Sequence, residues 1–357
     1  ARPHLRPVWT DRPHAPYVLL ARGRKSQRQA LEPSPESLKA MYGTVWRIRL
    51  FEEEANRQAA FGNVQGAFHM YCGEEAVAVG FCAHLRPDDY VVGTHRSHGH
   101  YIAKGGPIDR MMAELFGRDG GICKGKGGSM HVADFSIGML GANGIVGGGF
   151  APATGAALAS QLRGEDRVTV CFFGDGAMQR GTFHEAINMG AIWNLPVIYV
   201  CENNQYQQWI PQSRMTKVTS VRDMAPSYGI PGESVDGQDV VAVSQVAGDA
   251  IERARTGQGP TLIECVTYRF HGHSLGDLQE YRGKEEVAYW VNERDPIQLL
   301  RTYLMERQQL SEDEDAAIQS AAVAEIRAAV AFAEASPFPA DAEIVTDVFT
   351  APDGAAR

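Results

Sequence analysis

Several features that would place a protein in a specialised class are missing from these 357 residues. The six cysteines are scattered and form no CxxC pair, which argues against a disulfide framework and suits reduced, intracellular thiols. The net charge is −9, so neither nucleic acid nor an anionic membrane is expected as a main partner. No apolar run looks long enough to span a bilayer. With 44% hydrophobic and 22% charged residues, the composition is that of a soluble globular protein.

The N-terminal segment has a composition of its own. Residues 1–30 carry seven Arg or Lys and a single acid, Asp11, a bias that is typical of transit peptides. Four prolines before residue 17 are incompatible with an amphipathic helix, so residues 1–35 are predicted to form an extended arm that lies on a partner. We expect a cytoplasmic protein, with the mitochondrial matrix as the alternative.

After the arm, helical stretches alternate with short apolar runs. Residues 37–61 have the spacing of a long amphipathic helix. Runs rich in Val and Ile predict strands within 88–95, 167–173, 195–201 and 259–270. Strands that are apolar on both faces and separated by helices indicate a parallel sheet, and hence an α/β domain over 36–285 with helices on both sides. From 286 the pattern becomes helical and charged, which predicts a C-terminal helical portion and tail over 286–357.

A strand–helix–strand crossover is predicted between residues 167 and 201. The helix that separates the two strands is marked by a T-x-x-E capping box, Thr182 and Glu185. Such a crossover makes the two strands parallel and near neighbours. Residues that follow each strand therefore meet at the carboxyl edge of the sheet, where open α/β folds bind ligands.

Polar residues stand at these two strand ends. Asp175 lies between Gly174 and Gly176 after the first strand, and Asn204 follows the second. Each motif alone suits an ordinary turn. Together, a carboxylate and an amide oxygen are too few to enclose a cation, but they suit Mg²⁺ when phosphate oxygens complete its coordination. The glycines let the backbone approach a diphosphate, and the following helix offers free N–H groups, so the pair predicts a diphosphate–metal site.

The surrounding sequence, GDGAMQRGTFHEAINMGAIWNLPVIYVCENNQY, resembles the alpha subunits of the dehydrogenase component of 2-oxo acid and acetoin dehydrogenase complexes. The resemblance extends over about residues 36–350 and includes THRSHGHYIAKG, GRDGGICKGKGGSMHVAD and GPTLIECVTYRFHGHS. GMLGANGIVGGG looks more like the acetoin branch, whereas YRFHGHSLGD also fits the pyruvate branch. The resemblance implies the thiamine diphosphate-binding fold. It also implies an oxidoreductase that forms a hydroxyalkyl adduct on this cofactor and passes the acyl group to a lipoyl acyltransferase.

The resemblance implies roles for individual residues. Mg²⁺ would be bound by the side chains of Asp175 and Asn204 and by the backbone carbonyl of Tyr206. His69 and His273 match catalytic histidines that face the thiazolium and the diphosphate.

Further positions would contact the cofactor itself. Arg96 matches a diphosphate-binding arginine, and its guanidinium fork suits that geometry. His95 stands where relatives often carry tyrosine. The remaining cofactor-binding positions are Gly144, Val146, Gly174, Gly176 and Ala177.

The implied active site is incomplete in one chain. The glutamate that contacts the pyrimidine ring of the cofactor is carried by a separate beta subunit in this family, so an α2β2 heterotetramer is implied, together with a lipoyl-bearing acyltransferase. The chain also departs from its relatives at Gln179 and Arg180, and again at residues 207–209. Gln207, Gln208 and Trp209 follow the metal turn, so they are predicted to wall the pocket and select the substrate. The alternative is a loop that turns outward to meet the beta subunit.

Two other functions stay open: a regulatory relative without turnover, and a metal hydrolase built on some of the eleven histidines. No cysteine lies at zinc-ligand spacing from the two HGH triplets, and His98, His100 and His271 are interpreted as residues that order loops. GGICKGKG nearly matches a P-loop, but Gly127 occupies the place of the Ser or Thr that must reach the metal. Ser274 matches a phosphorylated position of mitochondrial relatives, although an ordinary loop serine is the preferred interpretation.

Overall fold

A central sheet of six parallel strands organises the structure, a computed structural model that describes residues 33–64 and 66–348. The strand order is β2-β1-β3-β4-β8-β7, and every neighbouring pair is parallel. The strands are β1 Tyr90–Val92, β2 Met139–Gly141, β3 Thr169–Gly174, β4 Val197–Asn203, β7 Gly232–Asp236 and β8 Thr261–Val266. The predicted parallel α/β sheet is confirmed. The predicted arm lies almost wholly outside the described residues.

The described residues also form eleven α-helices. They are α1 Pro35–Ala60, α2 Glu75–Cys82, α3 His98–Ala103, α4 Ile108–Leu115, α5 Phe150–Leu162, α6 Gly181–Ile192, α7 Gln212–Met215, α8 Val240–Arg255, α9 Lys284–Glu293, α10 Pro296–Glu306 and α11 Glu312–Ala335. Short 3-10 turns are η1 Phe135–Ile137, η2 Asp175–Gln179, η3 Val221–Tyr228 and η4 Asp341–Val345. A two-stranded antiparallel hairpin, β5 Tyr206–Gln207 and β6 Ile210–Pro211, follows β4.

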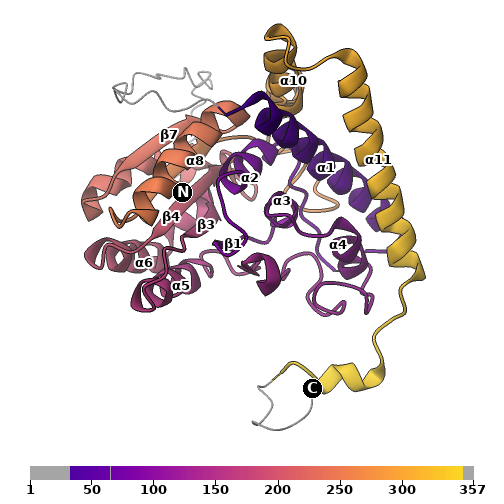
Figure 1. Cartoon of the computed structure of the whole chain (residues 1–357), viewed down its shortest axis with the longest axis horizontal. Helices are drawn as coiled ribbons and strands as arrows, with labels where there is room; N and C mark the ends of the chain where they lie inside the picture. Colours follow the sequence, from indigo (N-terminus) through magenta and orange to yellow (C-terminus); the bar gives the residue numbers. More distant parts are fainter. Residues whose placement is uncertain (1–32, 65, 349–357) are drawn as a thin grey trace, which may run out of the picture. The chain divides into compact units, whose positions relative to one another are not determined.

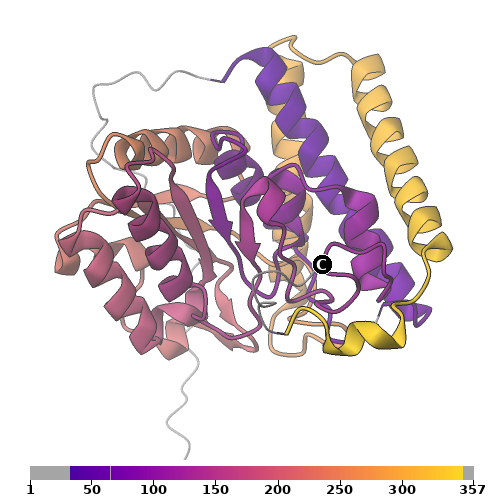
Figure 2. The same ribbon diagram turned by 60° about the horizontal axis from the view of Figure 1, so that its bottom comes forward.

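The strands are apolar throughout because both faces of the sheet are covered. On β3, Val170 and Phe172 belong to a core that includes residues of α1, α2 and α8. Cys171 and Phe173, which alternate with them, belong to a second core with α5 and α6. Figure 2 shows the strands between α8 on one side and the α5–α6 pair on the other. A two-sided core of this kind is the usual setting of a parallel sheet.

The crossover between β3 and β4 forms as predicted, but its capping box does not. Helix α6 begins at Gly181, and its N-cap, Arg180, makes no side-chain capping bond. Thr182 is already inside the first turn, and its hydroxyl donates to the backbone carbonyl of Gly147 at 3.2 Å. The threonine therefore holds the glycine-rich loop before α5 instead of capping its own helix.

Three helices, α9, α10 and α11, lie between residues 284 and 335, and α11 runs beside α1 (Figure 1). Tyr42 donates to Asp315 at 2.7 Å, and Arg47 forms an ion pair with Glu325 at 2.7 Å. By length and composition alone α11 could cross a membrane, which the sequence analysis did not expect. This is a weak indication, because core helices of soluble proteins can meet the same test.

Candidate cofactor and catalytic site

The ends of β3 and β4 lie side by side at the carboxyl edge of the sheet. Gly174 pairs in register with Glu202, so Asp175 and Asn204 both follow directly from this pair. The two turns also touch: a Cβ added to Gly176 would lie 3.5 Å from the Cβ of Gln207. The sequence prediction that Asp175 and Asn204 belong to one edge of the sheet is therefore confirmed.

Asp175 has a buried carboxylate in which one oxygen forms no hydrogen bond with the described residues. The residue is 2% exposed, and its Oδ2 has no hydrogen-bond partner among the described residues. Burial raises the pKa of Asp175 to about 7, and the charge of Arg269 opposes this rise. A buried, unpartnered carboxylate oxygen is unfavourable unless a cation or a donor satisfies it. The position therefore fits a metal ion.

The second strand end supplies two more oxygens. Within the described part of the chain, Asn204 Oδ1 accepts one long bond, 3.3 Å, from the backbone N–H of Tyr206, and an amide oxygen has two lone pairs. The hydroxyl of Tyr206 donates to Glu286 at 2.8 Å, which anchors this turn from outside. The Asn204 oxygen and the Tyr206 carbonyl could therefore join Asp175 around one ion.

Arg96 brings a buried positive charge to the same region. It is 3% exposed, and its guanidinium donates to the backbone carbonyls of Met70 and His273. Its Nε lies 3.8 Å from a Glu74 oxygen. Burial lowers the pKa of Arg96 to about 10, which leaves the side chain charged at neutral pH. A buried guanidinium of this kind fits an anion such as a diphosphate.

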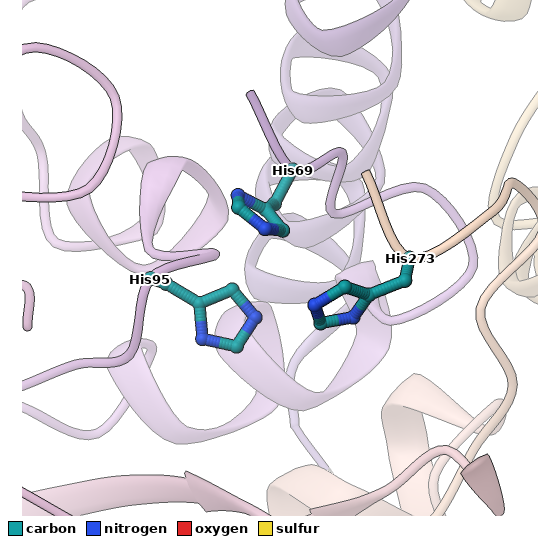
Figure 3. Close-up of side chains that lie close together, drawn as sticks. All are labelled: His69, His95 and His273. Carbon is teal, nitrogen blue, oxygen red and sulfur yellow. The ribbon is translucent and has the colours of Figure 1, made fainter. Parts of the chain in front are cut away.

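Three histidines from separate segments converge on one another (Figure 3). His69 precedes α2, His95 follows β1 and His273 follows β8. The ring centroid of His69 lies 4.6 Å from that of His95 and 5.0 Å from that of His273. His69 Nδ1, His95 Nε2 and His273 Nδ1 have no partner among the described residues. Each ring therefore has a nitrogen available to a ligand.

The electrostatics of this cluster favour an anion over a metal ion. One nitrogen from each histidine lies within 4.8 Å of the others, which is close enough to suggest a metal centre. However, burial and then the charge of Arg96 lower the pKa of His69 to about 3 and that of His273 to about 4. The same two causes lower the pKa of His95 to about 2. A cation would meet the repulsion of Arg96 as well, and no carboxylate of the described residues belongs to the cluster. The metal-hydrolase hypothesis is weakened accordingly.

A pocket joins further predicted cofactor positions. His95, Val146 and Ala177 line one pocket, together with Phe150 and Phe173 from the second core. Val146 is 48% exposed on the loop before α5. Gly144 lies in the same loop but does not line the pocket.

The three residues after Tyr206 separate into two groups. Gln208 and Trp209 form the turn of the β5–β6 hairpin and are exposed, Trp209 by 55%. Gln207 is partly buried beside Gly176, and its Nε2 has no partner among the described residues. Among the three, Gln207 is the residue that contacts the Asp175 turn, while the selection of the substrate by these residues stays a prediction.

The histidines outside the cluster have structural contacts. His98 and His100 lie in helix α3, and each also bonds a residue of an irregular segment, Ser129 at 2.9 Å and Tyr71 at 3.3 Å respectively, which agrees with the loop-ordering interpretation. His98 bonds with Glu52 of α1 at 2.8 Å, and His100 with Glu202 of β4 at 2.8 Å. They tie α3 to its neighbours. His271 is exposed.

The glycine-rich segment 120–127 is irregular, as predicted, and its amides already have an acceptor. The buried carboxylate of Glu114 accepts backbone N–H bonds of 2.7 to 3.0 Å from Cys123, Gly125, Gly127 and Gly128. An internal carboxylate thus occupies the place that a phosphate would take in a P-loop.

Sequence reasoning missed two buried charged residues of the site. Glu74 contacts both Asn204 and Arg96, and Arg269 is 1% exposed and acts on the pKa of Asp175. Two acids directly before the apolar stretch of α2 were the available signal for Glu74.

Comparisons with known proteins agree with the resemblance. The sequence model of the family named dehydrogenase E1 component matches residues 44–341. The alpha subunit of acetoin:2,6-dichlorophenolindophenol oxidoreductase from Bacillus subtilis is 49% identical, with 90% of this chain and 96% of that one covered. The subunit of that name from Cupriavidus necator is 44% identical, with 91% and 98% covered. Pyruvate dehydrogenase E1 component subunit alpha from Porphyra purpurea is 42% identical, with 87% and 92% covered. This chain belongs to the dehydrogenase E1 component family, whose members depend on thiamine diphosphate.

Proposed function

We propose that this chain is the alpha subunit of an acetoin-cleaving dehydrogenase, with pyruvate as the alternative substrate. Its broader class, the thiamine diphosphate-dependent dehydrogenases of 2-oxo acids or acetoin, follows from the family and from relatives on both branches. The two relatives named for acetoin are 49% and 44% identical, and the relative from Porphyra named for pyruvate is 42% identical. This ranking supports acetoin.

One pair of observations supports Mg²⁺ with the diphosphate. Asp175 offers an unpartnered buried oxygen, and Arg96 offers a buried positive charge in the same region of the structure. A magnesium diphosphate supplies a cation for the first and an anion for the second. Asp175, Asn204 and the Tyr206 carbonyl would hold the ion, and Arg96 would hold the diphosphate.

The remaining chemistry divides between the cofactor and the chain. When bound, thiamine diphosphate supplies the group that adds to a carbonyl carbon and stabilises the negative charge left by carbon–carbon cleavage. The chain's neutral imidazoles can accept or return a proton: at neutral pH the depressed pKa values leave His69 and His273 uncharged. Each neutral ring therefore has one nitrogen that can accept a proton.

A beta subunit would complete the site. Ile145 and Val146 line the pocket and are exposed, and Trp209 is exposed at the hairpin beside it. Large apolar side chains that gather at the rim of a site are typical of a surface covered by a partner. The beta subunit and a lipoyl acyltransferase are accordingly part of the proposal.

The test is turnover by the chain assembled with a beta subunit, with 2,6-dichlorophenolindophenol as electron acceptor. With thiamine diphosphate and Mg²⁺ present, we expect kcat/KM for acetoin to exceed that for pyruvate by about tenfold, a difference of about 1.4 kcal/mol. The reverse ranking would assign the chain to pyruvate. Cofactor binding without turnover of either substrate would favour the regulatory alternative.

A further inference from the structure

Glu74 lies between the metal side and the diphosphate side of the candidate site. It is 1% exposed and directly precedes α2. Its Oε1 accepts a 3.1 Å hydrogen bond from Asn204 Nδ2, and the same oxygen lies 3.8 Å from Arg96 Nε. One carboxylate oxygen therefore faces two donors that belong to opposite ends of the site.

The hydrogen bond between Glu74 and Asn204 fixes the orientation of the Asn204 side-chain amide. The amide nitrogen is directed at Glu74, and the amide oxygen accepts from the backbone N–H of Tyr206 at 3.3 Å. If the amide turned over, its oxygen would face the acceptor oxygen of Glu74, and its NH₂ group would face an N–H donor. Both contacts would become repulsive. Glu74 thus keeps the oxygen of Asn204 on the side of the Tyr206 turn.

We propose that Glu74 is a positioning residue that orients the Asn204 amide so that its oxygen, and not its nitrogen, is presented to Mg²⁺. This inference rests on the proposed function, because it assumes that Mg²⁺ and thiamine diphosphate bind at this edge. Glu74 would act through Asn204 without contacting the ion. Loss of such an outer contact typically lowers metal affinity by about 10–100-fold.

Two substitutions separate orientation from general stability. Glu74→Met keeps the approximate volume but removes the acceptor. Glu74→Gln keeps an acceptor, and because Asn204 and Arg96 both present donors, the carbonyl end of the glutamine should turn towards them. Glu75 provides a matched control. It is the next residue, is equally buried, and is engaged elsewhere, by Arg49 Nε at 2.5 Å and the Gly73 N–H at 2.8 Å.

The experiment measures thiamine diphosphate binding by calorimetry at increasing Mg²⁺, using the full chain assembled with a beta subunit. Mn²⁺ in place of Mg²⁺ gives an independent readout, the bound ion observed by electron paramagnetic resonance. We expect Glu74→Met to raise the half-saturating metal concentration by about tenfold or more. Glu74→Gln should restore it to within about threefold of the parent, about 0.65 kcal/mol. Glu75→Met should lower the melting temperature without moving the metal dependence.

Each other outcome has a defined meaning. An unchanged metal dependence in Glu74→Met overturns the inference, as does an equal loss in Glu74→Gln, because the glutamine keeps the acceptor. An equal loss in Glu75→Met would show that any buried carboxylate at this helix end matters only for stability. A parent enzyme that binds no thiamine diphosphate would instead refute the proposed function, and this inference with it.

Discussion

Replacing Asp175 by asparagine should have opposite effects on stability and on metal binding. Asparagine has nearly the same shape but no charge to bury. The folded chain keeps a proton on Asp175 up to a pKa of about 7, whereas the unfolded chain releases it near the ordinary value of 3.8. Between these pH values the folded state binds more protons, so the stability of the cofactor-free chain falls as pH rises from about 4 to 7.

The magnitude follows from the same two values. Their difference of about 3 pH units corresponds to about 4 kcal/mol, an upper figure for the cost of the buried charge above pH 7. Asp175→Asn should remove that cost, so the variant should be more stable than the parent at pH 8, and by a smaller margin, about 1.6 kcal/mol, at pH 5, which is about 1.2 pH units above 3.8. It should also lose Mg²⁺-dependent binding of thiamine diphosphate, because a charged ligand is gone.

The assay is urea unfolding of the full chain in EDTA at pH 5 and pH 8, beside calorimetry with Mg²⁺ and thiamine diphosphate. Asp277→Asn is the control: this carboxylate accepts the His273 N–H at 2.6 Å and the Tyr281 hydroxyl at 2.9 Å, and its pKa is lowered. Its replacement should destabilise the chain at both pH values. A variant Asp175→Asn that is less stable than the parent at pH 8 would refute the reasoning, and so would one that keeps its cofactor affinity.

Further predictions concern the residues around the cofactor. His273→Ala should retain cofactor affinity in calorimetry but lose transfer to a lipoyl acceptor; loss of dye reduction with transfer intact would contradict this role. Gln207→Leu should change the ratio of kcat/KM for acetoin and pyruvate by about tenfold, because its amide lies beside Gly176, while the exposed Gln208→Leu should leave the ratio unchanged. An equal change in both variants would show that neither residue faces the substrate. The chain purified without a beta subunit should show no dye reduction with either substrate, and turnover by the single chain would disprove the shared site.

The sheet could be predicted only where its strands are covered on both faces. β3 and β4 are continuous apolar runs because α-helices pack on either side, and their parallel pairing followed from the crossover. The two edge strands escaped prediction. β2 has only three residues, and β7 has the sequence GESVD, in which polar residues interrupt the apolar pattern. Edge strands are not buried along their whole length, so their sequences lack the continuous apolar run by which a strand is predicted.

The site was predictable where function places residues at strand ends, and not where it depends on side-chain contacts across the fold. Asp175 and Asn204 stand directly after recognisable strands. The direction of Gln208 depends on a hairpin of two-residue strands in which Gln208 itself has a φ of 62°, and no glycine marks this turn. Glu74 is 130 residues from Asn204 in sequence, so only the folded chain shows that the two touch.

The carboxylate of Glu114 holds residues 123–128 in their folded conformation. Four backbone amides between Cys123 and Gly128 converge on one carboxylate of the same chain, so this segment needs no outside anion to take its shape. The conformational entropy of ordering these glycines is therefore lost when the protein folds and not when a ligand arrives. Because the loop is already ordered, a ligand that later binds against it does not lose affinity to the entropy cost of ordering it.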